Sequence, residues 1–183
     1  RQTRRHHPFM HQRGYGATDR PEKVEDYESN TKFSLVYFKT GIENMSESLE
    51  LYNKNILSVR KEFSYEDKKD SFRVDLALFL NGIPIVMIEL KKETAGQKAD
   101  FEGTKQYRET RNPDELVFSF NRRALVYFAV DEFTAFVTTR LDKRETKFLP
   151  FNKGTQDEGA GNPVTPGKHS TYYLWEEILQ KDM

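Results

Sequence analysis

Two apolar runs joined by an Asn-Gly pair constrain the fold of this chain more than any other feature. The stretch FRVDLALFLNGIPIVMIELKKE, residues 72–93, has the pattern of a β-hairpin, because Asn-Gly favours a tight two-residue turn. Both runs are apolar on both faces near the turn, so we expect the hairpin to be central in a sheet. Its strands nevertheless carry Asp75, Glu89 and Lys91. Buried acids are costly unless they are paired or bound to a metal.

The register of the hairpin decides whether these charged side chains can meet. Side chains two residues apart in a strand share a face, so Glu89 and Lys91 point the same way. A strict two-residue turn would pair Val74 with Glu89, and Asp75 would face away. A three-residue loop, or a bulge at Gly82, shifts the pairing by one residue. We predict this shifted register, in which Asp75 lies on the face of Glu89 and Lys91.

In that register the hairpin would present two carboxylates beside an ammonium group. Such a pair suits a hard divalent cation such as Mg²⁺, which prefers oxygen ligands and keeps several waters. The carbonyl of Leu90 could supply a further oxygen. Lys91 could orient or deprotonate a water, or stabilise a developing negative charge. This chemistry suits hydrolysis of a phosphodiester, and an ordinary cluster of ion pairs is the alternative interpretation.

Composition limits the class of protein. The 183 residues suffice for one ordinary domain with a core. The 29 basic and 29 acidic residues balance, so a DNA-binding surface would have to be a local patch. The absence of cysteine excludes disulfides and thiolate metal sites and suits a reducing cytoplasm. No apolar stretch is long enough to span a bilayer, and the basic N-terminal residues lack the apolar core of a signal peptide.

The predicted elements follow the order β-α-β-β-β-α-β-β-α, which indicates an α+β domain with helices flanking a mixed sheet. Besides the hairpin, we expect strands at 32–39, 57–65, 124–130 and 135–141, with 146–151 as a candidate for one more, and helices at 46–56, 94–111 and 171–180.

The N-terminal residues 1–31 are polar and basic, and we expect a loosely held arm ahead of one domain at 32–183. An arm that contacts DNA is the alternative. The chain starts with Arg1 and stops at Met183 just after a helical pattern. We therefore expect it to be part of a longer protein.

The hairpin and several other stretches resemble a known family. VDLALFLNGIPIVMIELKKE is similar to the PD-(D/E)xK nuclease motif as it occurs in the N-terminal domain of the restriction (R) subunit of type I restriction–modification enzymes. The stretches LYNKNILSVRKEFSY, QYRETRNPDELVFSFNRRALVYFAVD, TKFLPFNKG, GAGNP and YLWEEIL follow the pattern of that family in the same order. The resemblance implies a restriction-endonuclease-like fold.

The resemblance also implies catalytic roles. Asp75 and Glu89 match the metal-binding acids, with Mg²⁺ as the ion, and Lys91 matches the catalytic lysine. The family often adds Gln-x-x-x-Tyr on the following helix. Gln106 matches the glutamine, although its neighbour Tyr107, and not the fourth residue after it, is the tyrosine.

A Gln97 match to the same motif is the alternative, but the fourth residue after it is Phe101. The second half of the motif therefore departs from the family pattern in both cases.

The function implied by the resemblance is cleavage of double-stranded DNA, together with modification and specificity subunits, in the cytoplasm of a bacterium or archaeon. Cleavage would follow ATP-driven translocation by motor domains for which this chain has no room. The stretch GAGNPVTPGKHS is no Walker A motif, because five residues separate Gly161 from Gly167 and His169 follows Lys168. We therefore expect no ATP site here. The alternative is a non-catalytic DNA-binding or docking module that keeps the fold.

DNA contacts are expected to involve phosphates, because the resemblance implies that another subunit chooses the sequence. Helix-surface ion pairs, Lys98 with Glu102 and Lys105 with Glu109, are an alternative role for two of the candidates. A core position is the alternative for Tyr107. The candidate DNA-binding residues are Lys92, Lys98, Lys105, Tyr107, Arg108, Arg111, Arg122 and Arg123.

Overall fold

The computed structural model describes residues 23–26, 31–39, 46–65, 73–155 and 157–182. The chain divides into two compact units, residues 1–54 and 55–183. In the first unit, β1 (Lys23–Asp26) pairs antiparallel with β2 (Thr31–Ser34), and α1 (Ser46–Asn53) follows. Most of the expected N-terminal arm lies outside the described residues, and its boundary near residue 31 remains a prediction.

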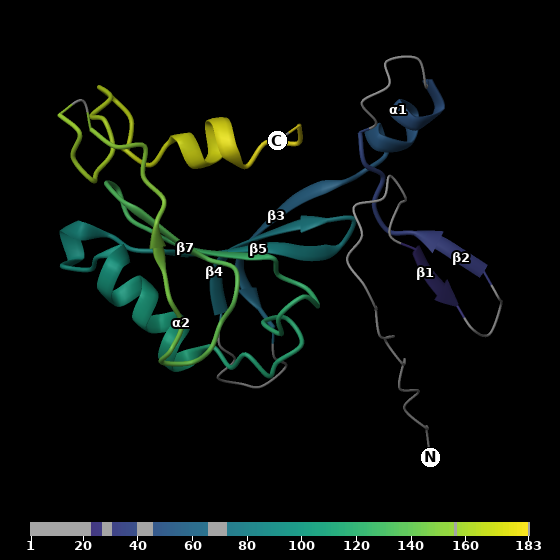
Figure 1. The fold of residues 1–183 in the computed structure, drawn as a ribbon, viewed down its shortest axis with the longest axis horizontal. Helices are drawn as coiled ribbons and strands as arrows, with labels where there is room; N and C mark the ends of the chain where they lie inside the picture. Colours follow the sequence, from purple (N-terminus) through teal and green to yellow (C-terminus); the bar gives the residue numbers. More distant parts are fainter. Residues whose placement is uncertain (1–22, 27–30, 40–45, 66–72, 156, 183) are drawn as a thin grey trace. The chain divides into compact units, whose positions relative to one another are not determined.

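The second unit is built on a six-stranded mixed sheet with the strand order β3-β4-β5-β6-β7-β8 (Figure 1). Only β5 and β6 are parallel, and the other neighbours pair antiparallel. The β4–β5 hairpin is interior to the sheet, as its apolar faces predicted, and the α+β class is confirmed. The strands are β3 (Leu57–Ser64), β4 (Arg73–Leu80), β5 (Ile83–Leu90), β6 (Val126–Val130), β7 (Ala135–Thr138) and β8 (Leu149–Pro150).

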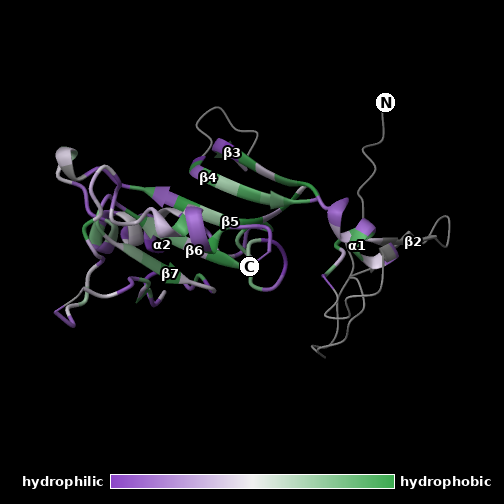
Figure 2. Cartoon of the chain, turned by 90° about the horizontal axis from the view of Figure 1, so that it is seen from above, coloured by the Kyte–Doolittle hydropathy of each residue, from purple (hydrophilic) through white to green (hydrophobic). Residues whose placement is uncertain are grey.

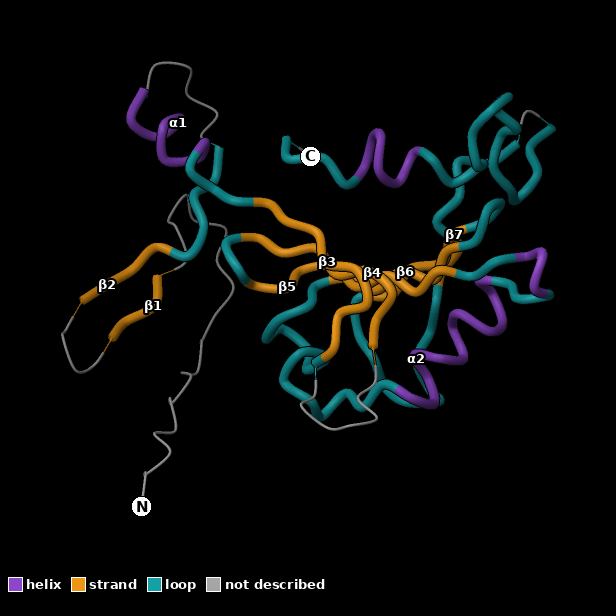
Figure 3. The backbone as a smooth tube through the Cα atoms, turned by 180° about the vertical axis from the view of Figure 1, so that it is seen from behind, coloured by secondary structure: helices purple, strands orange, loops and turns teal. Residues whose placement is uncertain are grey.

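Short helical segments flank this sheet. α2 (Thr104–Thr110) and the helical turn η3 (Leu174–Ile178) lie on opposite faces of the sheet, as both Figure 1 and Figure 3 show. The continuous helix predicted over 94–111 is wrong. The segment consists of η1 (Glu93–Ala95), η2 (Ala99–Gly103) and α2, because Gly96 has a φ of +70° and interrupts the helix after its first turn.

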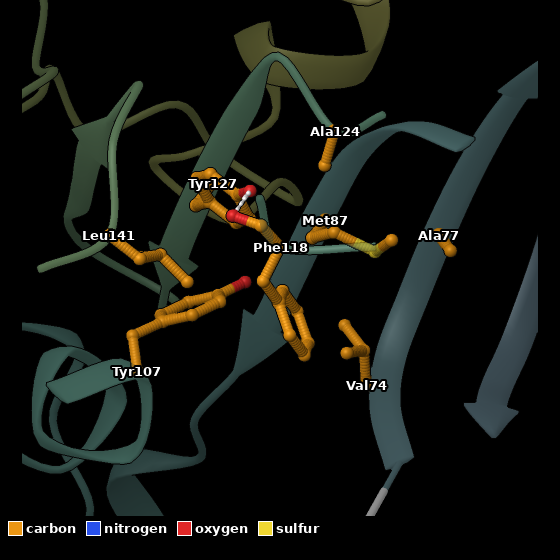
Figure 4. Close-up of a cluster of buried hydrophobic side chains, with 8 residues drawn as sticks. All are labelled: Val74, Ala77, Met87, Tyr107, Phe118, Ala124, Tyr127 and Leu141. Carbon is orange, nitrogen blue, oxygen red and sulfur yellow. Dashed lines mark hydrogen bonds between the residues drawn. The ribbon is translucent and has the colours of Figure 1, made fainter. Parts of the chain in front are cut away.

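Two hydrophobic clusters cover the two faces of the sheet, and much of its strands is coloured green, for hydrophobic residues, in Figure 2. β5 contributes to both, because Met87 belongs to the first cluster and its neighbours Val86 and Ile88 to the second. Figure 4 shows the first cluster, which contains Val74, Ala77, Met87, Tyr107, Phe118, Ala124, Tyr127 and Leu141. The second contains Val86, Ile88, Phe128, Val130, Ala135, Tyr173 and Leu174.

None of the helices in the described residues is long and apolar enough to cross a bilayer.

Candidate active site

The hairpin closes with the tight turn that its Asn-Gly pair favours. Leu80 pairs directly with Ile83. Asn81 and Gly82 both have positive φ, 50° and 83°, as such a turn requires. Ile56 holds Asn81 in place, because its N–H donates to Asn81 Oδ1 (2.7 Å) and its carbonyl accepts from the Asn81 N–H (2.8 Å). The predicted three-residue loop or bulge at Gly82 is therefore wrong.

The shift in register is nevertheless present, further along β5. Phe79 pairs with Pro84, whereas Leu78 pairs with Val86. Ile85 is therefore an extra residue, a β-bulge, and it moves every later residue of β5 to the other face. The bulge follows Pro84 directly, which has no N–H to donate to the ladder.

The bulge brings the two acids together. Leu76 and Ile88 form the last pair of the β4–β5 ladder, and one more step in the same register would bring Asp75 opposite Glu89. The Leu90 N–H donates to Asp75 Oδ2 at 2.7 Å, which holds the Asp75 carboxylate against the end of β5. Asp75 is half-buried and Glu89 is fully buried. Asp75 therefore lies beside the neighbour of Glu89 in the chain, and Glu89 itself faces Arg111 at the end of α2.

The partner of Glu89 is Arg111, one of the basic residues predicted to contact DNA. Arg111 caps the C-terminus of α2. Its Nε and Nη2 both donate to Glu89 Oε1, at 3.0 and 2.5 Å. Nη1 donates to the Tyr65 hydroxyl at 3.2 Å, and Nη2 also donates to the Arg73 carbonyl. Because this guanidinium is buried and its nitrogens are occupied, Arg111 is not a DNA contact.

The other oxygen of Glu89, Oε2, is buried and has no hydrogen-bond partner among the residues that the structure describes. Burial raises the pKa of Glu89 to about 7, more than the charge of Arg111 lowers it. Burial lowers the pKa of Arg111, but the Glu89 carboxylate offsets this, and the net pKa lies above its ordinary value. A buried carboxylate oxygen without a donor is unfavourable, and a cation would satisfy it.

The oxygens at this position fit a hard cation such as Mg²⁺. Glu89 Oε2, the Asp75 carboxylate and the Leu90 carbonyl are all of the type that Mg²⁺ prefers. Within the described part of the chain, no three His, Cys, Asp or Glu side chains gather as a metal-binding group. Two carboxylates are enough for Mg²⁺, which completes its ligands with waters and substrate phosphates.

Lys91 lies next to these acids and is held by α2. Its Nζ donates to Gln106 Oε1 at 2.5 Å, and its backbone N–H donates to the Val130 carbonyl at 2.8 Å. The structure thus brings Gln106 to Lys91. Gly103 allows this close approach, because a Cβ there would lie 2.9 Å from Ala129 Cβ and 3.4 Å from Lys91 Cγ.

Tyr107 is a core residue. It is fully buried, its hydroxyl donates to the Phe128 carbonyl at 3.3 Å, and its ring packs against Tyr127. Its burial removes Tyr107 from the expected DNA contacts. The residue four positions before it is Gly103, where a glutamine side chain would collide with the sheet. Gln106 reaches Lys91 instead, from the next turn of the helix.

Three of the basic candidates are exposed on the segment that follows β5, namely Lys92, Lys98 and Lys105. Lys105 makes the expected surface pair with Glu109, at 3.9 Å. Lys98 uses its backbone N–H, which donates to Glu102 Oε2 at 2.7 Å.

The arginine candidates differ in position. Arg108 is half-buried, and its Nε donates to the Thr146 carbonyl at 3.0 Å. Arg122 and Arg123 precede β6, which starts beside Val86 and runs parallel to β5. Three residues of β5, roughly 10 Å, separate Val86 from Glu89. The structure does not bring Arg122 and Arg123 together with Asp75 and Glu89.

The structure is thus an α+β domain whose central hairpin carries two acids and a lysine near one another. Known proteins show which family has this domain. The family model "Type I restriction enzyme R protein N terminus" matches residues 12–146, and the chain belongs to this family. The resemblance inferred from the sequence is confirmed.

A curated relative is the "Putative type I restriction enzyme MjaVIIIP endonuclease subunit" of Methanocaldococcus jannaschii, to which the chain is 29% identical over 112 residues. The match covers 59% of this chain and 11% of the relative, so the chain spans a small part of that protein. No solved structure matches the chain.

Proposed function

We propose that the chain is the endonuclease module of a type I restriction enzyme R subunit, and that it hydrolyses phosphodiester bonds of double-stranded DNA with Mg²⁺. The observation that carries the proposal is that Asp75 accepts from the N–H of Leu90, the neighbour of Glu89, while Glu89 Oε2 is buried without a donor among the described residues. In ordinary ion-pair clusters the great majority of buried carboxylate oxygens have a hydrogen-bond partner. The name of the archaeal relative, an endonuclease subunit, agrees with this function.

The hairpin residues would divide the chemistry between them. Asp75, Glu89 and the Leu90 carbonyl would hold Mg²⁺, which when bound acts as a Lewis acid on the phosphate. Lys91 carries a positive charge beside the two acids, where it can orient the attacking water or stabilise the negative charge that develops on the phosphate. Gln106 keeps the Lys91 ammonium in place, because its Oε1 accepts from Nζ.

DNA would reach this site through phosphate contacts made by the exposed Lys92, Lys98 and Lys105. These lysines form a local basic set on a chain of zero net charge. Choice of sequence, modification and ATP-driven translocation would belong to the other subunits and to the rest of the R subunit. The complex would act in the cytoplasm of a bacterium or archaeon.

The test uses the whole R subunit assembled with its modification and specificity subunits. We expect Asp75→Ala, Glu89→Ala and Lys91→Ala each to abolish Mg²⁺-dependent cutting, measured on plasmid DNA. ATP hydrolysis and assembly should remain at wild-type levels. If cutting survives all three substitutions, the domain is a non-catalytic docking or DNA-binding module.

A further inference from the structure

We infer that Arg111 is a positioning residue that determines which oxygen of Glu89 is available to a cation. This inference rests on the proposed function, because it concerns the same metal site. Arg111 lies outside the hairpin motif, 22 positions after Glu89 in the chain.

The geometry of the Glu89–Arg111 pair differs from that of an ordinary structural ion pair. A guanidinium commonly binds a carboxylate with two parallel hydrogen bonds, one to each oxygen. Here both Nε and Nη2 donate to the same oxygen, Oε1. Oε2 receives no hydrogen bond from the described part of the chain, although the side chain is fully buried. The pair therefore neutralises the charge of Glu89 while leaving one oxygen available.

Arg111 is itself fixed, so it cannot turn to the second oxygen without losing other contacts. Nη1 donates to the Tyr65 hydroxyl, and Nη2 donates to the Arg73 carbonyl. Arg73 stands two residues before Asp75 on β4. The guanidinium thus links the end of α2 to both strands that carry the acids, and it sets the orientation of Glu89 relative to Asp75.

A purely structural role predicts a different outcome from a positioning role. Loss of one partner of a buried ion pair destabilises the fold in either case. Only the positioning role predicts that cation affinity falls in a variant that remains folded. The discriminating measurement is therefore the affinity for Mn²⁺, used as a probe in place of Mg²⁺, with no DNA present and no cleavage required.

The experiment measures Mn²⁺ binding to the 183-residue chain by the electron paramagnetic resonance signal of free Mn²⁺. We expect Arg111→Lys, which keeps the charge, to weaken binding about tenfold, as substitution of a residue that orients a metal ligand does. Tyr65→Phe removes one anchor of Arg111 and should weaken binding about fivefold, the equivalent of one hydrogen bond. Thermal unfolding followed by circular dichroism shows which variants are folded.

The matched control for Tyr65→Phe is Tyr127→Phe. Both tyrosines pack against Phe118, and the Tyr127 hydroxyl donates to the Phe118 carbonyl, away from Arg111. This control should bind Mn²⁺ within about twofold of wild type. If Tyr65→Phe binds as tightly as Tyr127→Phe, or a folded Arg111→Lys binds as wild type, the inference is overturned. If Arg111→Lys does not fold, the comparison of Mn²⁺ binding between Tyr65→Phe and Tyr127→Phe still tests the inference.

A third variant, Asp75→Asn, separates this inference from the proposed function. It should lose Mn²⁺ binding, because it removes a proposed ligand. If Asp75→Asn binds Mn²⁺ as wild type does, the metal site of the proposed function is wrong. If Asp75→Asn loses binding while Tyr65→Phe and Arg111→Lys keep it, the metal site stands and only the role of Arg111 is refuted.

Discussion

At the scale of single residues, the site depends on how Lys91 is held. The residue is half-buried, and its ammonium donates to Gln106 Oε1 at 2.5 Å. A lysine side chain has a flexible four-carbon stem, so without an acceptor its ammonium would sample many positions. Gln106 therefore contributes by limiting where the positive charge lies relative to Asp75 and Glu89.

We expect Gln106→Leu to lower the cleavage rate of the assembled enzyme about 10- to 100-fold, as loss of a supporting contact to a catalytic group does. DNA affinity should change little, because the Gln106 side chain contacts Lys91 and is not among the proposed DNA contacts. The control is Glu109→Gln on the same helix, whose carboxylate pairs only with Lys105 at the surface among the ion pairs described. A Gln106→Leu enzyme that cuts at the rate of the Glu109→Gln enzyme would contradict this role.

The sequence predicted a shared location for residues whose chemistry is unusual in their surroundings, and their catalytic roles stay predictions. Asp75, Glu89 and Lys91 stand out because they interrupt apolar strands. Arg111 was assigned to DNA because nothing in its neighbourhood marks it as buried. Its partner lies on another element, and only the general rule that a buried acid needs a cation could have indicated such a residue.

At the scale of elements, a bulge and a close helix contact assemble the site. The bulge at Ile85 turns Glu89 toward Asp75, and Gly103 lets the helical segment approach β6 closely. The sequence indicated that the register must shift by one residue. It could not place the shift, because a bulge can lie at many positions along a strand, and Pro84 was the only local signal.

We expect Gly103→Ala to reduce cleavage and to destabilise the domain by about 1–3 kcal/mol, a typical cost of overpacking. The added Cβ would lie 2.9 Å from Ala129 Cβ, so the helix must move and take Gln106 away from Lys91. The readouts are the rate of plasmid cleavage and urea unfolding of the chain.

The control is the double variant Gly103→Ala/Ala129→Gly. It removes the colliding atom and leaves contacts of 3.4 Å to Lys91 Cγ and 3.7 Å to Ala129 Cα. We expect it to cut faster than Gly103→Ala alone. Additive losses in the double variant would show that the contact between Gly103 and Ala129 does not position the helix.

At the scale of the whole molecule, the site is part of the folded unit of residues 55–183. The two acids come from neighbouring strands, and Arg111 and Gln106 come from the helical segment that covers them. These groups meet only in the folded state. A cation held by them should therefore stabilise the entire unit, because it binds the folded and not the unfolded chain.

We expect Mg²⁺ at ten times its dissociation constant to raise the free energy of unfolding by about 1.4 kcal/mol. Urea unfolding at increasing Mg²⁺ concentration measures this effect. Asp75→Asn should abolish it, and K⁺ at equal ionic strength should not reproduce it. An equal stabilisation of wild type and Asp75→Asn would mean that Mg²⁺ acts elsewhere on the chain.

The most direct test of the metal site is the position of the ion itself. Crystals of the chain soaked in Mn²⁺ and measured at the manganese absorption edge would reveal it by anomalous scattering. We predict a peak at Glu89 Oε2 and the Asp75 carboxylate, and no peak there in crystals of Asp75→Asn. A wild-type crystal with Mn²⁺ bound only at other positions, and none between Asp75 and Glu89, would contradict the central claim.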